Sequence, residues 1–291
     1  MKHHFGDSLP RDKGYWTIVP NRERYAYGIG KVREGDPRIK IVTIGKDEEN
    51  WRRVLTLPRL EELTLHEPTA EQLEAVGVLS KIRRLRITHA RPKDIGFISG
   101  MRSVEELVLE YISGFDDLSP LAGLKKLRAL HLENLRRVED FGGLAGIKAL
   151  RYLAIHGTLD WNQPIADVEF LRGLRSLEVL ALFQTKIRAR YPAMLPALTL
   201  KKLRTLRVHS SYLPTEECAL LEAGLPKVEG TQWGPFHRWT PNGPKSQVFV
   251  FTGRGAGRVQ ASSKMAATKC AESAKRYETM KKRAREIIGA R

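Results

Sequence analysis

Apolar residues recur along most of the chain in a spacing that is typical neither of one long helix nor of isolated strands. Each unit ends in two apolar residues separated by one position, with further apolar positions before them at intervals of three. The first clear unit is Leu57-x-x-Leu60-x-x-Leu63-x-Leu65. The residues equivalent to Leu63 in the six later units are Leu85, Leu107, Leu130, Leu153, Leu180 and Leu206. These anchors are 22, 22, 23, 23, 27 and 26 residues apart, so the pattern is an internal repeat.

Each Leu-x-Leu predicts a short strand with both leucines on one face, because successive side chains of a strand point to opposite sides. One unit of this size cannot bury its apolar face alone, whereas stacked units share a continuous core. The pattern therefore predicts a solenoid over residues 57–233 with one parallel strand per repeat. A coiled coil is excluded because it would need a period of seven residues.

The repeats resemble those of the leucine-rich-repeat family over about residues 57–233. The stretch FDDLSPLAGLKKL at 115–127 is most similar to the short repeats of bacterial internalin-like members. The resemblance implies an α/β solenoid, a horseshoe with a parallel sheet on its concave side. One feature departs from the family: its usual asparagine after the strand is present as Asn134 but not regularly in the other repeats.

The sequence before the repeats predicts an N-terminal cap, because an open solenoid would expose its core leucines. Residues 1–56 form this cap. Within it, residues 39–44 alternate like a first, irregular strand, and the aromatic-rich stretch 16–27 is expected to pack beneath that strand.

The sequence after the repeats predicts a second cap and a tail. Thr215 is expected to be the N-cap of a convex-side helix, and residues 228–233 are expected to form a last, weak strand. Residues 234–246 are rich in proline and glycine and predict a connector. Residues 247–291 predict a basic hairpin followed by a helix over about 263–288, a short strand–helix tail.

Composition narrows the class of protein. Of the 291 residues 42% are hydrophobic, which suffices for a packed core and excludes wholesale disorder. No apolar run approaches the roughly 18 to 20 residues that a membrane span needs, and no secretory signal is predicted at the start. Cys218 and Cys270 have no metal-ligand spacing, so we expect reduced thiols in a cytoplasmic protein.

The predicted register brings an apolar surface to the concave side of the second half of the solenoid. Its members are Ala129, Tyr152, Ala154, Val179, Ala181 and Phe183. Histidines border this surface, and a patch of this kind usually marks an interface with aromatic anchors. The predicted partner-binding residues are Tyr152, Phe183, His131, His156, His209 and Val179, with Trp161 and Tyr191 walling the site from the two longer repeats. The alternative is that the C-terminal segment folds back over the patch.

The charged residues on the first strands have a simpler explanation. Glu62, Arg84 and Glu106 alternate in sign on adjacent strands, so we expect them to pair with one another. His131 and His156, with Glu110 and Glu133 nearby, could suggest a metal site. No local metal-binding motif supports one, and the register is expected to hold the two imidazole rings apart, so we predict no metal and no cofactor.

Catalytic motifs are not evident. The run Gly253-x-Gly255-x-Gly257 matches neither the dinucleotide fingerprint nor the P-loop, and a flexible hairpin turn explains it better. No serine elbow or acid–base pair stands out. We therefore predict that the protein is not an enzyme.

The charge suggests a second function class. The net charge is +17, and the last 51 residues carry 12 basic and 3 acidic side chains, so a near-neutral body bears a basic tail. A cation also precedes each predicted strand. The possible anion-binding residues are Lys125, Lys126, Lys148, Lys201, Lys202, Lys282 and Arg283. The alternative function is thus nucleic-acid binding through the basic repeat edge and the C-terminal helix, expected to be weak.

The favoured function is a non-catalytic protein-binding scaffold that uses the concave face of the solenoid. Its partner is another protein, with no membrane involved. An adaptor, inhibitor or immunity-like protein of bacterial type fits this prediction, and the immunity-like role is implied by the family resemblance alone.

Overall fold

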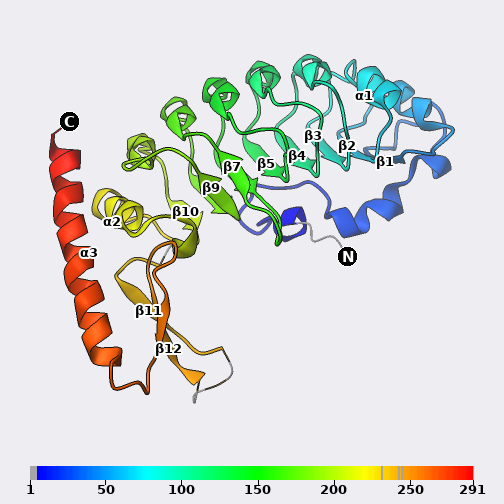
Figure 1. The fold of residues 1–291 in the computed structure, drawn as a ribbon. Helices are drawn as coiled ribbons and strands as arrows, with labels where there is room; N and C mark the ends of the chain where they lie inside the picture. The colour runs from blue at the N-terminus through cyan, green and yellow to red at the C-terminus, as the bar shows by residue number, and fades with distance from the viewer. Residues whose placement is uncertain (1–4, 231, 242, 244–245, 291) are drawn as a thin grey trace.

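A computed structural model describes residues 5–230, 232–241, 243 and 246–290. Eight parallel strands form one sheet in the order β1-β2-β3-β4-β5-β6-β8-β10 and line the inner side of an arc (Figure 1). Their bounds are β1 (Ile41–Gly45), β2 (Glu62–His66), β3 (Arg84–Thr88), β4 (Glu106–Glu110), β5 (Ala129–Glu133), β6 (Tyr152–His156), β8 (Val179–Phe183) and β10 (Thr205–Val208). The predicted α/β solenoid with a concave parallel sheet is confirmed.

The outer side of the arc is built from short helices, one per repeat. They are α1 (Ala70–Val76), η5 (Gly96–Gly100), η6 (Ser119–Gly123), η7 (Gly142–Gly146), η8 (Glu169–Gly173), η9 (Leu195–Thr199) and α2 (Thr215–Gly224), of which those marked η are 3-10 helices. The two longer repeats add β7 (Gln163–Ile165) and β9 (Thr185–Ile187), which pair with each other.

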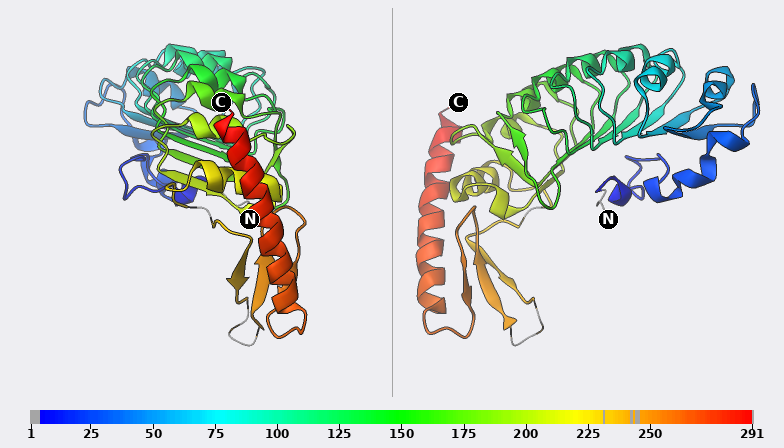
Figure 2. Two further views of the ribbon diagram at one scale, coloured as in Figure 1. Left: turned by 90° about the vertical axis from the view of Figure 1, so that its left-hand side faces the viewer. Right: turned by 45° about the vertical axis from the view of Figure 1, so that its right-hand side comes forward.

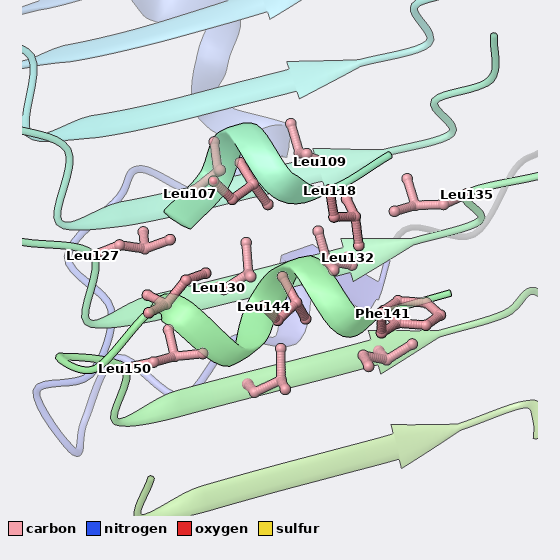
Figure 3. Packing of buried hydrophobic residues seen from close by; sticks show 14 of the residues in the cluster. Leu107, Leu109, Leu118, Leu127, Leu130, Leu132, Leu135, Phe141, Leu144 and Leu150 are labelled. Carbon is pink, nitrogen blue, oxygen red and sulfur yellow. The ribbon is translucent and has the colours of Figure 1, made fainter. Parts of the chain in front are cut away.

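The leucine anchors set the register of the sheet. Leu107, Leu130 and Leu153 lie opposite one another on adjacent strands, and all three are completely buried. Figure 3 shows Leu107 and Leu130 beside leucines of the convex turns, Leu118 and Leu144, and all four belong to one core cluster that continues from repeat to repeat. The two-residue alternation therefore sends the leucines inward and the intervening side chains to the concave surface.

The turn after five of the eight strands of the sheet keeps one backbone geometry, although asparagine occurs there only once. Glu67, His89, Tyr111, Asn134 and Gln184 all follow a strand directly and have φ between 49° and 56°. Most of these residues donate a backbone hydrogen bond to the last residue of the next strand, as Tyr111 does to Glu133 at 2.8 Å. This repeated bond offsets the strain of a left-handed backbone at residues other than glycine.

The N-terminal cap contains the expected first strand, since β1 pairs in register with β2. Four 3-10 helices accompany it: η1 (Phe5–Ser8), η2 (Asn21–Tyr27), η3 (Ile29–Lys31) and η4 (Trp51–Thr56). η2 lies against β1 as predicted for the stretch 16–27, but Trp16 does not: it lies far along the concave face, against Tyr152. Residues 1–4 of the predicted cap lie outside the described residues.

The C-terminal cap differs from its prediction in two details. α2 forms, but its N-cap residue is Pro214, and the Thr215 hydroxyl instead donates a hydrogen bond to the carbonyl of Thr252 at 2.9 Å. The strand expected at 228–233 is reduced to a single bridge between Glu229 and Thr205 in the described part of that segment, which lacks residue 231. η10 (Ser210–Tyr212) joins β10 to α2.

The segment predicted as a connector contains a strand. β11 (Phe236–Trp239) pairs antiparallel with β12 (Val248–Phe251), which also pairs with β13 (Arg258–Gln260). Its four residues carry three aromatic rings, and the prolines and glycines on either side concealed this pattern; residues 242 and 244–245 of the connector lie outside the described residues.

The final helix α3 (Ala266–Gly289) matches its prediction and runs past both the small sheet and α2 (Figure 2). Two side chains of α3, Tyr277 and Ala284, are buried, and its Lys281 forms an ion pair with Glu222 of α2 at 2.7 Å. The basic tail is therefore packed against the end of the solenoid. None of the helices in the described residues is long and apolar enough to cross a membrane.

Replacing Leu153 with alanine should lower the free energy of unfolding by about 2 to 5 kcal/mol, because the stacked repeats cannot close the cavity left in the core. Lys148→Ala, at an exposed site in the same repeat, should change it by no more than about 0.5 kcal/mol. Urea unfolding followed by circular dichroism measures both values. Equal losses would mean that the repeat register is wrong.

Candidate functional site

The chain's own N-terminal segment covers most of the concave apolar patch. Residues 5–20, called the strap below, cross the sheet on its concave side (Figure 2). Three buried side chains of the strap, Leu9, Trp16 and Ile18, pack on the sheet. The sheet residues beneath them are Val108, Ala129, Tyr152, Ala154, Val179 and Ala181.

This covering corrects the predicted exposure of the partner-binding residues. Tyr152 is 3% exposed and Val179 4%, while His131 is completely buried and His156 is 7% exposed. The patch does need a cover, as its composition indicated, but the N-terminal strap supplies it and not the C-terminal segment. The strap has few apolar residues at irregular spacing, so the sequence contained little sign of this docking.

Carboxylates on the sheet hold the strap through its backbone. Glu106 accepts hydrogen bonds from the amides of Thr17 at 2.8 Å and Ile18 at 2.9 Å. Glu62 accepts one from the amide of Val19 at 2.8 Å, and Arg86 donates one to the carbonyl of Val19 at 3.1 Å. The strap forms no strand, so these side chains satisfy backbone groups that would otherwise be buried without partners.

The predicted pairing of charges on the first strands is confirmed only in part. Arg84 binds Glu62 at 2.6 Å, as expected. Glu106 instead pairs with Arg128 of the following repeat at 2.5 Å, in addition to holding the strap. Its carboxylate therefore joins two repeats and the N-terminal segment.

A cluster of buried polar side chains lies beneath the start of the strap. Glu110 is 3.4 Å from Arg86, and the His131 Nε2 atom is 3.2 Å from Glu133. The rings of His131 and His156 are 4.9 Å apart, which corrects the expectation that the register would separate them. The amide of Phe5 in the strap donates to Glu133 at 2.9 Å.

This cluster has unusual protonation chemistry and one set of metal-ligand atoms. Burial raises the pKa of Glu110 to about 7, while burial and then the neighbouring His131 lower the pKa of His156 well below its ordinary value. Ligand atoms of Glu110, His131 and Glu133 lie within 4.8 Å of one another, a donor set that suits a divalent cation. Because the Arg86 cation and the Phe5 amide already contact these carboxylates, we assign the cluster to holding the strap.

An open groove remains at the C-terminal end of the concave face. It has a volume of about 500 Å³ and is lined by Phe183, Arg207, Val208, His209, Ser210, Gly230, Gln232, His237, Arg238 and Trp239. We call it the end groove. Trp239 is 47% exposed, and burial followed by the nearby His209 lowers the pKa of His237.

The end groove brings together predicted and unpredicted residues. Phe183 and His209 were predicted from the repeat register. Sequence reasoning missed His237, Arg238 and Trp239, because they lie on β11 within the expected connector. The available signal for this strand was the run Phe236-His237-Arg238-Trp239, in which three of the four side chains are aromatic.

A second hollow of about 510 Å³ continues from the end groove along the strap. It is lined by Pro10, Lys13, Tyr15, Tyr152, Val179, Leu203, Arg204, Thr205, Arg207, Lys227 and Glu229. Arg207 lines both hollows, so they are neighbours on one face. The edges of Tyr152 and Val179 thus border an open hollow although both residues are largely buried.

The remaining predicted residues lie elsewhere. Trp161 packs beneath the guanidinium of Arg136, 4.5 Å from its ring, and Tyr191 faces Arg283 of α3 at 5.9 Å, so neither lines the end groove. The seven possible anion-binding residues are all exposed. Their binding of anions stays a prediction.

The chain has the leucine-rich-repeat fold. Each repeat of 22 to 27 residues contributes one parallel strand with two inward apolar residues, mostly leucines, and a short helix on the convex side. No family model matches the chain, and no curated protein sequence matches it. Solved structures that are similar to it include three bacterial proteins. Internalin C2 of Listeria monocytogenes is 24% identical, covering 59% of this chain and 67% of its own, with a TM-score of 0.41.

The other two are an internalin of the same bacterium and a leucine-rich-repeat protein of Leptospira interrogans, each 17% identical, with TM-scores of 0.41 and 0.42. The former match covers 67% of this chain and 68% of the internalin, and the latter covers 77% and 60%. Since all three TM-scores are below 0.5, the class rests on the repeats and sheet of this chain.

Trp16→Ala should release the strap from the sheet, because it removes a ring that is 1% exposed and packs edge-on against Tyr152. We expect a loss of about 3 to 5 kcal/mol in the stability of the docked strap. Hydrogen exchange of residues 14–19 should increase while that of β4 and β5 changes little. Tyr25→Ala, at a side chain that is 74% exposed, is the control, and unchanged strap exchange in the Trp16 variant would contradict the docking.

The raised pKa of Glu110 predicts a pH dependence of stability. The folded carboxyl titrates near 7 and the unfolded one near 4.5, so between these values the folded chain holds the extra proton and this contribution is lost as pH rises. The stability of wild type relative to Glu110→Gln should be about 2 to 3 kcal/mol greater at pH 5 than at pH 8. Comparing the two proteins cancels the opposite contribution of His156. A difference that does not vary with pH in urea unfolding would exclude the raised pKa.

Proposed function

We propose that the protein is a non-catalytic scaffold that binds another protein at the end groove. The observation that carries the proposal is the half-exposed Trp239 beside Phe183 and Arg207, in an open groove next to a concave face otherwise closed by the strap. Tryptophan and arginine are the side chains that most often dominate the binding energy of protein interfaces.

The chemistry of the groove favours a partner with both apolar and acidic side chains. Arg207 and Arg238 make no ion pair with any described residue, so their charges are available to a partner. His209 and His237 add hydrogen-bonding groups at the rim. Buried aromatic contacts would supply most of the affinity, and the arginines would select for carboxylates.

The role of adaptor, inhibitor or immunity-like protein follows from this proposal, since each acts by occupying a partner's surface and needs no chemistry of its own. A cytoplasmic, bacterial setting is part of the same proposal. The cytoplasmic part of it is supported by Cys218 and Cys270, which are both free thiols, the first of them buried.

Replacing Phe183 and Trp239 together with serine should weaken capture of the protein partner at least tenfold, because both rings lose their buried contact with it. Both side chains are at least partly exposed, so the fold should persist. Tyr25→Ser, an exposed ring at the other end of the arc, is the matched control. Affinity purification from the native cell, with nuclease added, measures the difference by quantitative mass spectrometry.

Capture that stays within about twofold of wild type in the double variant would contradict the end groove as the binding site. Capture that disappears on nuclease treatment of the wild type would favour the nucleic-acid alternative.

A further inference from the structure

A third hollow lies in the C-terminal region, between the β12–β13 hairpin and the first turns of α3. It has a volume of about 400 Å³ and is lined by Phe251, Ala256, Gly257, Arg258, Lys269, Glu272, Ser273 and Arg276. We call it the tail groove. It shares no lining residue with the end groove, so the two are separate features of the surface.

Three cations face the tail groove without a partner. Arg258, Lys269 and Arg276 are exposed, and none of their side chains makes a hydrogen bond or ion pair with a described residue. Glu272 is the one carboxylate among the lining residues. A groove with three unpaired cations and one carboxylate has the electrostatics of an anion site.

In the solenoid, by contrast, several arginines form ion pairs with glutamates of the neighbouring repeat. Arg83 pairs with Glu105 at 3.0 Å, and Arg151 pairs with Glu178 at 2.8 Å. In residues 247–290, ten basic side chains stand against three acidic ones, so complete pairing is impossible there. Residues 247–290 therefore carry a net charge of +7, and they form both walls of the tail groove.

The spacing of the cations on α3 indicates which kind of anion fits. Lys269, Arg276 and Arg283 follow one another at intervals of seven residues, which places them on nearly one face of the helix. At 1.5 Å per residue, each interval is about 10.5 Å along the helix axis. The three cations therefore extend over about 21 Å of the helix, which is the axial length of about six nucleotides of a duplex at 3.4 Å each.

The opposite wall of the groove can approach such a backbone closely. Gly257 has a φ of 81°, and a Cβ built on it or on Gly255 would meet nothing within 4 Å. The turn between β12 and β13 therefore presents bare backbone beside Arg258, where a side chain would keep a ligand away. Ser273 also lines the groove, and its hydroxyl donates a hydrogen bond to the carbonyl of Pro235 at 3.2 Å.

We propose that the tail groove binds the phosphate backbone of a nucleic acid. Lys269 and Arg276 contact phosphates on one side, and Arg258 contacts them from the hairpin. Arg283 continues the same row beyond the groove. An extended row of cations suits a polyanion that carries one charge per nucleotide along its whole length, whereas the carboxylates of an acidic protein surface form no such continuous line.

The test measures fluorescence anisotropy of labelled 20-base-pair RNA and DNA duplexes and of single-stranded RNA, with the full chain, between 50 and 200 mM salt. The groove variant combines Arg258→Gln, Lys269→Gln and Arg276→Gln. The control variant combines Lys31→Gln, Arg33→Gln and Lys46→Gln, and so removes the same charge from exposed positions of the N-terminal cap. Circular dichroism melts confirm the fold, and Arg276→Gln alone replaces the triple variant if that one unfolds.

We expect the groove variant to bind duplex at least tenfold more weakly at 150 mM salt, and its log–log salt slope to be smaller in magnitude by about 2 to 3, near 0.9 for each lost phosphate contact. The control variant should bind within about threefold of wild type. The RNA, DNA and single-strand probes identify the preferred backbone.

Three results would overturn the proposal. The first is equal weakening of duplex binding in the groove and control variants, which would show diffuse attraction. The second is wild-type binding that is undetectable at 150 mM salt, and the third is displacement of the duplex by polyglutamate as effectively as by unlabelled duplex. The last result would favour an acidic protein surface as the ligand of the tail groove.

Discussion

The alternation of inward and outward side chains along each strand of the sheet determines both the core and the concave surface of this protein. Because neighbouring strands pair without any shift, inward leucines form continuous rows, and the residues between them form rows on the concave face. One such outward row runs through Val108, His131, Ala154 and Ala181. The same register that builds the core therefore also places small, aromatic and ionisable side chains side by side on the opposite surface.

That concave surface could not remain bare, and the strap resolves two problems at once. Its three apolar side chains remove the apolar rows from water, and the carboxylates beside those rows accept hydrogen bonds from its backbone. A covering segment without strand pairing needs such partners. The concave face is thus mostly internal, and the proposed binding site lies at its C-terminal end, where β11 lines the end groove.

Charge is distributed by the same logic. Within the solenoid, arginines at the edges of strands meet glutamates of the neighbouring repeat, since repeats bring equivalent positions together. The C-terminal hairpin and α3 lie outside the repeat, and among the described residues Lys281 is their one cation in an ion pair, with Glu222 and Glu278. The protein therefore carries two unlike surfaces near its C-terminal end, one aromatic with arginines and one cationic.

The repeat and the register of its leucines could be predicted from the sequence, because a period of 22 to 27 residues with two-residue alternation allows one buried face. The strand β1 and the helices α2 and α3 could also be predicted. The sequence also placed Phe183 and His209 on the concave face, where both line the end groove. The burial of Tyr152, His131 and His156 could be seen only in the folded chain, since it depends on a strap more than a hundred residues away in the sequence. The same holds for the position of Trp239. Docking of an irregular segment follows from the shape and polarity of the folded surface, which leave no period in the sequence.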